Sequence, residues 1–269
     1  MQLHIRHETL YRYREPVKRS VQNLRMTPRR EPGQRTLTWK ISAPGRQHAQ
    51  IDAYGNVVHL LTRDDPHREI RILVSGVVDI EDSAGVVLPD EGRLSPLAYL
   101  AETSLTRPDE AMLSFVARSM PKTGDRRSDL LKLSEAVREA VQYEQGVTDV
   151  HESAARAFAR GKGVCQDHAH IFIACCRASG IPARYVSGYF YTGKDGDVAS
   201  HAWVDVWPGD DAGGWLAIDV THSALVGGQH CRLAVGRDYL DACPVRGVRR
   251  GGGPEEMHVA VSVAKSAQQ

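Results

Sequence analysis

Cys165 is the first candidate for chemistry, because it follows two glycines and precedes polar and imidazole side chains in GKGVCQDHAH, residues 161–170. A helix that begins here would hold the thiol in its first turn, where unpaired N–H groups and the helix dipole favour a thiolate. The glycines would also let a substrate approach closely. However, the dipole contributes only about 0.3–1 kcal/mol, so a thiol of pKa ~8.5 stays mostly protonated at neutral pH. A nucleophilic Cys165 therefore needs a base.

Cysteines can also serve as packing residues or as metal ligands. Free cysteine commonly packs as a small hydrophobe, which is the prediction for Cys175 and Cys176 in the apolar part of the same helix. His168 and His170 could bind a metal with Cys165, but a closed zinc site takes four ligands, usually in paired spacings. The sequence contains no Cys-x-x-Cys pair, which also disfavours a redox site. We expect no metal and no cofactor.

A histidine and a carboxylate are predicted to share one face of a hairpin downstream. In SHAWVDVW (200–207) and GWLAIDVTH (214–222) the alternation of apolar residues leaves His201, Trp203 and Asp219 on the non-apolar face. The turn-like PGDDAGG between the strands indicates antiparallel pairing. If the tryptophans nearest the turn pair, Asp219 faces Trp203 and is diagonal to His201; a shift by two residues would place it opposite His201.

This pair could supply the missing base. A carboxylate on one imidazole nitrogen fixes the tautomer, which leaves the other nitrogen to take a thiol proton. Beside an imidazolium and a helix N-terminus, the pKa of a cysteine can fall to roughly 3–7. The sequence thus favours a triad of Cys165, His201 and Asp219. Taken singly, His201 could instead be a hydrogen-bonded sheet histidine and Asp219 an edge carboxylate.

The chain divides by pattern into a β-rich module over 1–85, a connector over 86–107 and an α+β core over 108–269. Short runs of β-formers and turn signals characterise the module, and three- and four-residue apolar spacings begin at residue 108. The predicted strands are 3–13, 36–44, 56–64, 69–80, 184–191, 200–207, 214–222 and 257–263, and the predicted helices are 108–120, 125–145, 151–161 and 164–179. The last helix is apolar nearly all round, which predicts a buried helix that packs on an antiparallel sheet.

Charge and composition exclude several classes of protein. With a net charge of +1, 42% hydrophobic residues and 25% charged residues, the chain is typical of a globular protein with no general attraction to nucleic acid or membrane. Residues 1–40 hold ten Lys/Arg against three Asp/Glu, which two solvated faces of a β module explain more simply than a binding face. No run approaches the ~18 apolar residues of a membrane span, and the first residues include no signal-like apolar run. Five cysteines, an odd number, fit a reducing compartment, so we expect a cytoplasmic protein.

Together these motifs resemble the bacterial transglutaminase-like superfamily, whose members are often described as cysteine proteases. The resemblance is carried by GVCQDHAH, GIPARYVSGY, HAWVDV, GWLAIDVT and the later GRDYLDACPVRGV. The opening HETLYRY, with LRMTPR and AYGN after it, is similar to the β module that precedes this core in many bacterial members. The resemblance implies a papain-like fold in its transglutaminase variant, preceded by a β-rich domain.

The resemblance also implies roles: Cys165 as nucleophile, His201 as base and acid, and Asp219 as orienting carboxylate. We therefore expect thiol-dependent acyl transfer on a peptide or protein amide through a thioester, with hydrolysis favoured over amine transfer because water needs no second site. Val220 stands where the family commonly has proline, and His168 where an aromatic is more usual. Calcium-binding acidic loops are not recognisable, so no metal dependence is inferred. A non-catalytic scaffold that retains the fold is the competing hypothesis.

Substrate contacts are predicted less specifically. The Cys165 backbone N–H would hold the oxyanion, and Tyr143 and Gln166 are candidates for a side-chain donor. Strand parity puts Tyr189 and Trp203, together with Tyr191 and Trp207, on the side of His201. These aromatic residues either line an acyl groove or pack in the core.

Overall fold

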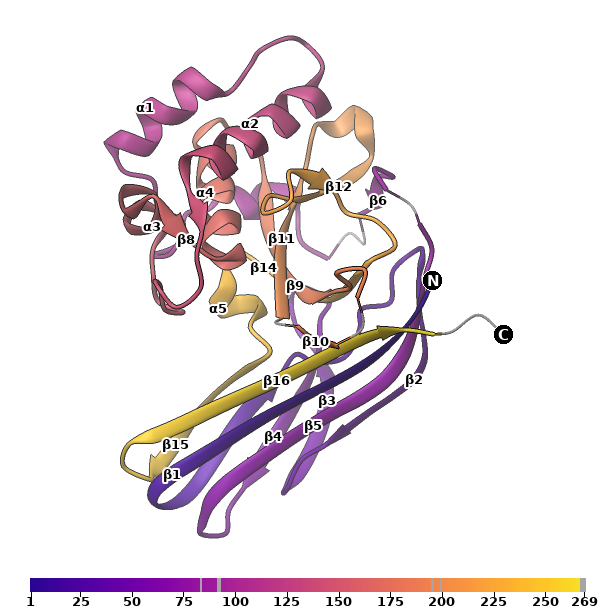
Figure 1. Ribbon diagram of the computed structural model, residues 1–269, viewed down its shortest axis with the longest axis vertical. Coiled ribbons are helices and arrows are strands. Elements are labelled where there is room, and N and C mark those ends of the chain that lie inside the picture. The colour runs from indigo at the N-terminus through magenta and orange to yellow at the C-terminus, as the bar shows by residue number, and fades with distance from the viewer. Residues whose placement is uncertain (83, 91–92, 195, 199, 267–269) are drawn as a thin grey trace.

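The computed structural model describes residues 1–82, 84–90, 93–194, 196–198 and 200–266. A β-rich body lies at one end of the molecule, and a core of helices and a second sheet lies at the other (Figure 1). The mixed α+β class predicted from the sequence is confirmed. Within the described residues, no helix has both the length and the apolar character that crossing a membrane requires.

The β-rich body is organised around one 23-residue strand, β1 (Gln2–Leu24). Its buried and exposed residues alternate at the start, which is the pattern of a strand with one face on a core. The first half of β1 pairs with β5 (His67–Ile80), and the second half pairs with β4 (Val57–Arg63). The remaining strands are β2 (Gln34–Ser42), which pairs with β5, and β3 (Arg46–Ile51), which pairs with β4.

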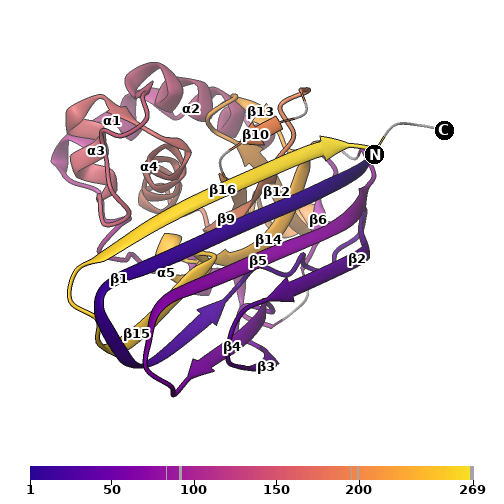
Figure 2. The same cartoon turned by 60° about the horizontal axis from the view of Figure 1, so that its bottom comes forward.

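The C-terminal strands return to this body rather than staying in the core. β15 (Val245–Gly251) and β16 (Glu255–Lys265) both pair with β1, so the two ends of the chain lie side by side (Figures 1 and 2). The predicted assignment of 108–269 to the core therefore needs correction at 245–265. Without these strands, one edge of β1 would expose its backbone N–H and C=O groups along its length.

The core packs four helices on an antiparallel sheet whose strand order is β13-β12-β11-β9-β14. The helices are α1 (Glu110–Ser119), α2 (Arg126–Ala140), α3 (Ala154–Arg160) and α4 (Cys165–Ala178). The strands are β9 (Ala183–Phe190), β11 (Ser200–Val206), β12 (Gly214–Asp219), β13 (Ala224–Leu225) and β14 (His230–Gly236). As predicted, α4 is buried along nearly its whole length, where it packs on β11 and β9.

Short elements complete the chain. They are β6 (Leu88–Pro89), a 3-10 turn η1 (Pro96–Leu100), β7 (Gln142–Tyr143), β8 (Lys162–Gly163), β10 (Gly196–Val198), a 3-10 turn η2 (Asp210–Ala212) and α5 (Tyr239–Ala242). The predicted connector over 86–107 thus contains β6, which pairs with the β12 edge. The helix predicted over 125–145 ends at Ala140, because the chain turns there into β7, which lies parallel to β8.

Buried charges join the two bodies. Asp205 of β11 is fully buried and accepts hydrogen bonds from Arg184 Nε (2.9 Å) and Arg232 Nη1. The Arg232 guanidinium also contacts Glu31 of the β-rich body at 2.8 Å. Burial opposes the ionised form of Asp205, but the two arginines outweigh it and hold its pKa below the ordinary value. Asn56, the last residue of the AYGN motif, adds a pair of hydrogen bonds to the Val235 backbone (2.7 and 2.8 Å).

Replacing Asp205 by asparagine should destabilise the protein by about 3–5 kcal/mol, because it leaves two buried guanidinium groups without their carboxylate. Urea unfolding followed by circular dichroism would measure this loss. Asp64→Asn is the matched control, since Asp64 pairs with Arg46 on the surface, where an ion pair contributes at most about 1 kcal/mol. Equal losses in the two variants would contradict the role of Asp205 as a buried junction.

Candidate active site

Cys165 is the first residue of α4, and a set of hydrogen bonds fixes this end of the helix. Asp167 Oδ2 accepts from the backbone N–H of Val164 (2.8 Å) and from the Thr148 hydroxyl (2.7 Å). The carboxylate thus satisfies one of the N–H groups that lack a partner at the helix start, and it connects the helix start to the loop before α3. Cys165 is therefore held at a defined position with its thiol partly accessible.

The glycines before Cys165 have structural roles, which differ from the predicted close approach of a substrate. Gly161 ends α3 in a left-handed conformation (φ 69°), which glycine adopts without steric cost. A Cβ on Gly163 would lie 2.7 Å from the Asp167 Cβ and Oδ2 atoms. The absence of a side chain at Gly163 thus leaves space for the Asp167 carboxylate, which caps α4. This cap in turn fixes the position of Cys165.

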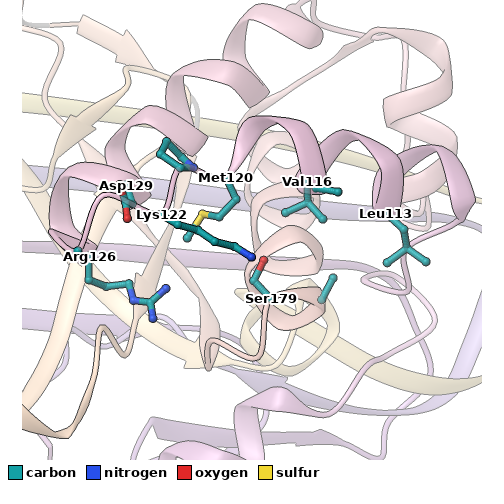
Figure 3. A pocket seen from close by; sticks show the side chains of 11 residues that line it. Leu113, Val116, Met120, Lys122, Arg126, Asp129 and Ser179 are labelled. Carbon is teal, nitrogen blue, oxygen red and sulfur yellow. The ribbon is translucent and has the colours of Figure 1, made fainter.

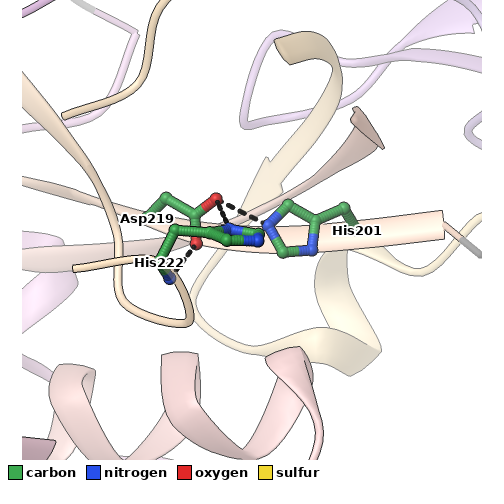
Figure 4. A group of neighbouring side chains, drawn as sticks. All are labelled: His201, Asp219 and His222. Carbon is green, nitrogen blue, oxygen red and sulfur yellow. Dashed lines mark hydrogen bonds and ion pairs between the residues drawn. The ribbon is translucent and has the colours of Figure 1, made fainter. Parts of the chain in front are cut away.

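His201 and Asp219 meet as the hairpin pattern predicts. β11 and β12 pair antiparallel with Val204 opposite Ile218, the register that places Asp219 across from Trp203 and diagonal to His201. His201 Nε2 donates to Asp219 Oδ2 over 2.7 Å (Figure 4). His201 is only 9% exposed, and Asp219 is fully buried. The carboxylate therefore fixes both the orientation of the imidazole and the nitrogen that carries hydrogen.

The sulfur of Cys165 lies within hydrogen-bonding reach of the same imidazole. Because Asp219 occupies Nε2, the ring presents Nδ1 to the thiol. Burial alone would lower the pKa of His201, but its hydrogen bonds to Asp219 and Cys165, and their charges, raise it to about 10. His201 is thus an imidazolium at neutral pH.

Asp219 has two further imidazole partners that the sequence did not reveal. His222 Nδ1 and His230 Nε2 lie 2.8 and 3.0 Å from Oδ2, and the backbone N–H of His222 donates to Oδ1. Gly227 N–H donates to His230 Nδ1, so His230 carries its hydrogen on Nε2 and donates it to the carboxylate. Burial raises the pKa of Asp219, but these hydrogen bonds lower it far below its ordinary value. The carboxylate therefore stays ionised.

The aromatic residue on the side of His201 is Phe190, not the predicted tyrosines. Gly188 lies opposite His201, so alternation along β9 puts Phe190 with His201 and turns Tyr189 to the other face. The Phe190 ring centroid is 4.6–5.2 Å from those of His201, His222 and His230. Tyr189 is buried, and its hydroxyl bonds to His7 of the β-rich body.

Trp203, which was also predicted as a possible groove residue, is fully buried. Its indole ring lies edge-on to His230, with a centroid separation of 5.2 Å. Trp203 and Tyr189 are therefore both buried, on opposite faces of the sheet, and neither offers surface to a substrate.

Tyr143 and Gln166 differ in their exposure. Tyr143 pairs with Gly163 in the β7–β8 ladder, two residues before Cys165, and is 45% exposed. Gln166 is buried, and its Nε2 points to the Val150 carbonyl oxygen at 3.4 Å. Of the two candidates for a side-chain oxyanion donor, Tyr143 is therefore accessible to solvent. The amide nitrogen of Gln166 is instead directed at the Val150 carbonyl oxygen.

The histidines within α4 are engaged elsewhere. His168 Nε2 donates to the Val141 carbonyl oxygen (2.9 Å), and its Nδ1 lies 3.1 Å from the Thr221 hydroxyl. His170 Nε2 accepts from the Tyr239 backbone N–H at 3.1 Å. Burial lowers the pKa of both imidazoles. Both are neutral imidazoles that hydrogen-bond within the core.

The five cysteines are all free, and four of them are buried. Burial raises the pKa of each of these four thiols, to about 12 for Cys175. Cys165, at the start of α4, is the only cysteine that is not fully buried. A thiol reagent used near neutral pH should therefore discriminate strongly between Cys165 and the rest.

One hollow in the structure adjoins the candidate active site, and a second lies away from it. One, of about 540 Å³, reaches Asp219, His222, His230 and Phe190. The other, of about 680 Å³, is lined by residues of α1, α2 and the last turn of α4 (Figure 3). That second hollow lies about 20 Å along α4 from Cys165, given a rise of ~1.5 Å per residue, so it is not part of this site.

Comparison with known proteins identifies the family of the chain. Residues 3–79 match the model of the bacterial transglutaminase-like N-terminal region, and residues 114–220 match that of the transglutaminase-like superfamily. The uncharacterized protein ML0607 of Mycobacterium leprae is 30% identical, with 97% of this chain and 98% of that protein covered. The chain belongs to the transglutaminase-like superfamily.

Two further proteins are similar to this chain over most of its length. Protein Rv2569c of Mycobacterium tuberculosis is also 30% identical, over 91% of this chain and 86% of its own length. The crystal structure of a proposed cysteine protease from Cytophaga hutchinsonii has the same fold, with a TM-score of 0.76 at 21% identity. That alignment covers all of this chain and 92% of the other, so the β-rich body and the transglutaminase-like core occur together in both proteins.

Replacing Asp219 by asparagine should destabilise the protein by about 3–5 kcal/mol at neutral pH, because it removes a paired buried charge. The folded-state pKa of Asp219 lies well below its ordinary 3.8, so its stabilisation is present above that pH and is lost on further acidification. Urea unfolding of both proteins between about pH 7 and pH 3 would measure the difference. Between about pH 7 and pH 4 the difference should hold or grow, because without Asp219 burial lowers the pKa of His201 and opposes its protonation. Below the ordinary pKa of Asp219 the difference should shrink, and a difference that still grows there would contradict this account.

Proposed function

We propose that this protein is an enzyme that transfers acyl groups from peptide or amide substrates through a thioester on Cys165, and that water is the usual acceptor. One observation carries the proposal: a single imidazole, His201, is bonded to a buried carboxylate through Nε2 and faces a helix-start cysteine with its other nitrogen. Membership of the transglutaminase-like superfamily supports the same chemistry.

In the proposed reaction, the Cys165 sulfur attacks the amide carbonyl carbon. The backbone N–H of Cys165, in the first turn of α4, stabilises the developing oxyanion, and the exposed Tyr143 hydroxyl is a candidate second donor. His201 Nδ1 protonates the leaving amine as the C–N bond breaks. The neutral imidazole then takes a proton from water, which attacks the thioester and releases the acid and the thiolate.

Alkylation with iodoacetamide tests the activation of Cys165. Because the thiolate is the reactive form, Cys165 should be modified at neutral pH, and His201→Ala should slow the modification at least about tenfold. Peptide mapping after labelling from about pH 6 to about pH 9 gives the rate at each cysteine. His48→Ala, at an exposed position in β3, is the control. An unchanged rate in the His201 variant would show that the two residues are not partners.

The reaction itself is tested with a mixture of short blocked peptides, with and without methylamine, followed by mass spectrometry. Acid quenching should trap a thioester on Cys165, and the products should be mainly hydrolysed peptide. Methylamine adducts that outpace hydrolysis would identify amine transfer instead. If neither a thioester nor any product forms, and Cys165→Ala behaves as the native protein does, the fold serves as a scaffold and the proposal fails.

A further inference from the structure

We propose that His201, Asp219 and His222 also form a binding site for a divalent transition-metal ion, with Zn²⁺ as the reference ion, and that the bound ion inhibits the enzyme. The inhibitory consequence rests on the proposed function, whereas ion binding itself does not. The metal site that the sequence disfavours would have its ligands on α4. The three residues proposed here lie instead on β11, at the end of β12 and in the turn that follows it.

The donor atoms already lie close together. One ligand atom from each residue falls within 4.8 Å of the others, and both imidazoles point at the same carboxylate (Figure 4). Two histidine nitrogens and a carboxylate oxygen, with water as the fourth ligand, form a common zinc ligand set. Zinc bonds of 2.0–2.2 Å in a tetrahedron separate the donors by about 3.4 Å. The spacings of 2.7 and 2.8 Å from Asp219 Oδ2 must therefore widen by roughly 0.6 Å, and the two imidazole nitrogens, which lie within 4.8 Å of each other, must approach the same separation.

His222 lies where its side chain can move to adjust these distances. Its side chain is 46% exposed, and it sits in the turn after β12 rather than in the sheet. To coordinate, its ring hydrogen must move from Nδ1 to Nε2, and His201 must release its Nε2 proton to solvent. Asp219 contributes the negative charge that an entering cation requires.

His230 completes the surroundings of such a site. Its Nε2–H donates to Asp219 Oδ2, and Gly227 fixes this tautomer from the other side. Carboxylate ligands in metal sites are commonly held by an outer hydrogen bond of this kind. His230 is thus a positioning residue for the carboxylate and not a ligand.

An entry path is also present. The hollow of about 540 Å³ is lined by Asp219, His222 and His230 and extends to Asp82, two residues after the end of β5. An ion can therefore reach the carboxylate without passing Cys165, which faces the other nitrogen of His201. Once bound, the ion occupies His201 Nε2 and Asp219, and so removes the hydrogen bond that orients the imidazole.

Titration calorimetry of the metal-free full-length protein with ZnCl₂ in a non-chelating buffer tests the site. We expect saturable binding of one ion, which persists in Cys165→Ala because the thiol is not a ligand. His222→Ala should weaken binding at least about tenfold, by comparison with the ten- to hundredfold losses that follow removal of outer partners. His48→Ala, at a surface site, should bind as the native chain does.

Cobalt absorption spectra provide a second readout. Co²⁺ in the proposed site should give tetrahedral d–d bands without a thiolate charge-transfer band. A thiolate band, or loss of binding in Cys165→Ala, would place the ion on Cys165 and overturn the proposal, as would unchanged affinity in His222→Ala or the absence of saturable binding. If zinc binds but the metal-free protein forms no thioester, the proposed function fails while the site stands. If zinc binds and thioester formation proceeds undiminished, the inhibitory role is wrong.

Discussion

The buried charge of Asp219 is the constraint on which the arrangement of the site depends. An ionised carboxylate without solvent is strongly unfavourable unless hydrogen bonds and opposite charge compensate it. Here the compensation comes from three imidazoles on three separate segments: β11, the turn after β12, and the start of β14. Folding these segments correctly is therefore also what assembles the chemistry.

That requirement shapes the sheet. β12 and β14 are three strands apart in the order β12-β11-β9-β14, which in a flat sheet would separate them by about 14 Å. The 3.0 Å contact between His230 and Asp219 means that the sheet curls strongly at this end. Phe190, on the intervening β9, fills the space inside the curl and contacts all three imidazole rings. The hydrogen bonds to Asp219 and the packing on Phe190 thus stabilise the same geometry.

The β-rich body contacts β14, the strand that carries His230, and so helps to position this end of the sheet. Arg232 lies two residues after His230 on that strand, and its guanidinium joins Glu31 of the body to the buried Asp205 of β11. Asn56 bonds to the backbone further along the same strand, at Val235. β14 is therefore fixed on one side by the core and on the other by the body. This gives the N-terminal residues a structural part in the site although they contribute none of its reactive groups.

Local patterns predicted the parts of the fold that local forces determine. The apolar α4 and the β11–β12 hairpin follow from periodicity and turn chemistry. Both registers that the sequence allowed put His201 and Asp219 on one face, so their meeting was predictable, although the register itself was not. His222 and His230 were not, because their approach to Asp219 depends on the curl of the whole sheet. The return of β15 and β16 to β1 involves partners more than 200 residues apart, and short-range patterns carry no information on such pairings. Tyr189 was placed on the wrong face because parity within β9 says nothing of its register against β11.

The two nitrogens of His201 have separate tasks in the proposed cycle. Nε2–H stays bonded to Asp219 throughout, while only Nδ1 gives and takes a proton. With its pKa raised to about 10, the resting imidazole is already protonated, so attack by sulfur does not have to wait for proton transfer to His201. The same ionised carboxylate also accepts from His230, whose pKa is lowered by burial and whose tautomer is fixed by Gly227. A neutral His230 thus adds a hydrogen bond to Asp219 without placing a second positive charge beside His201.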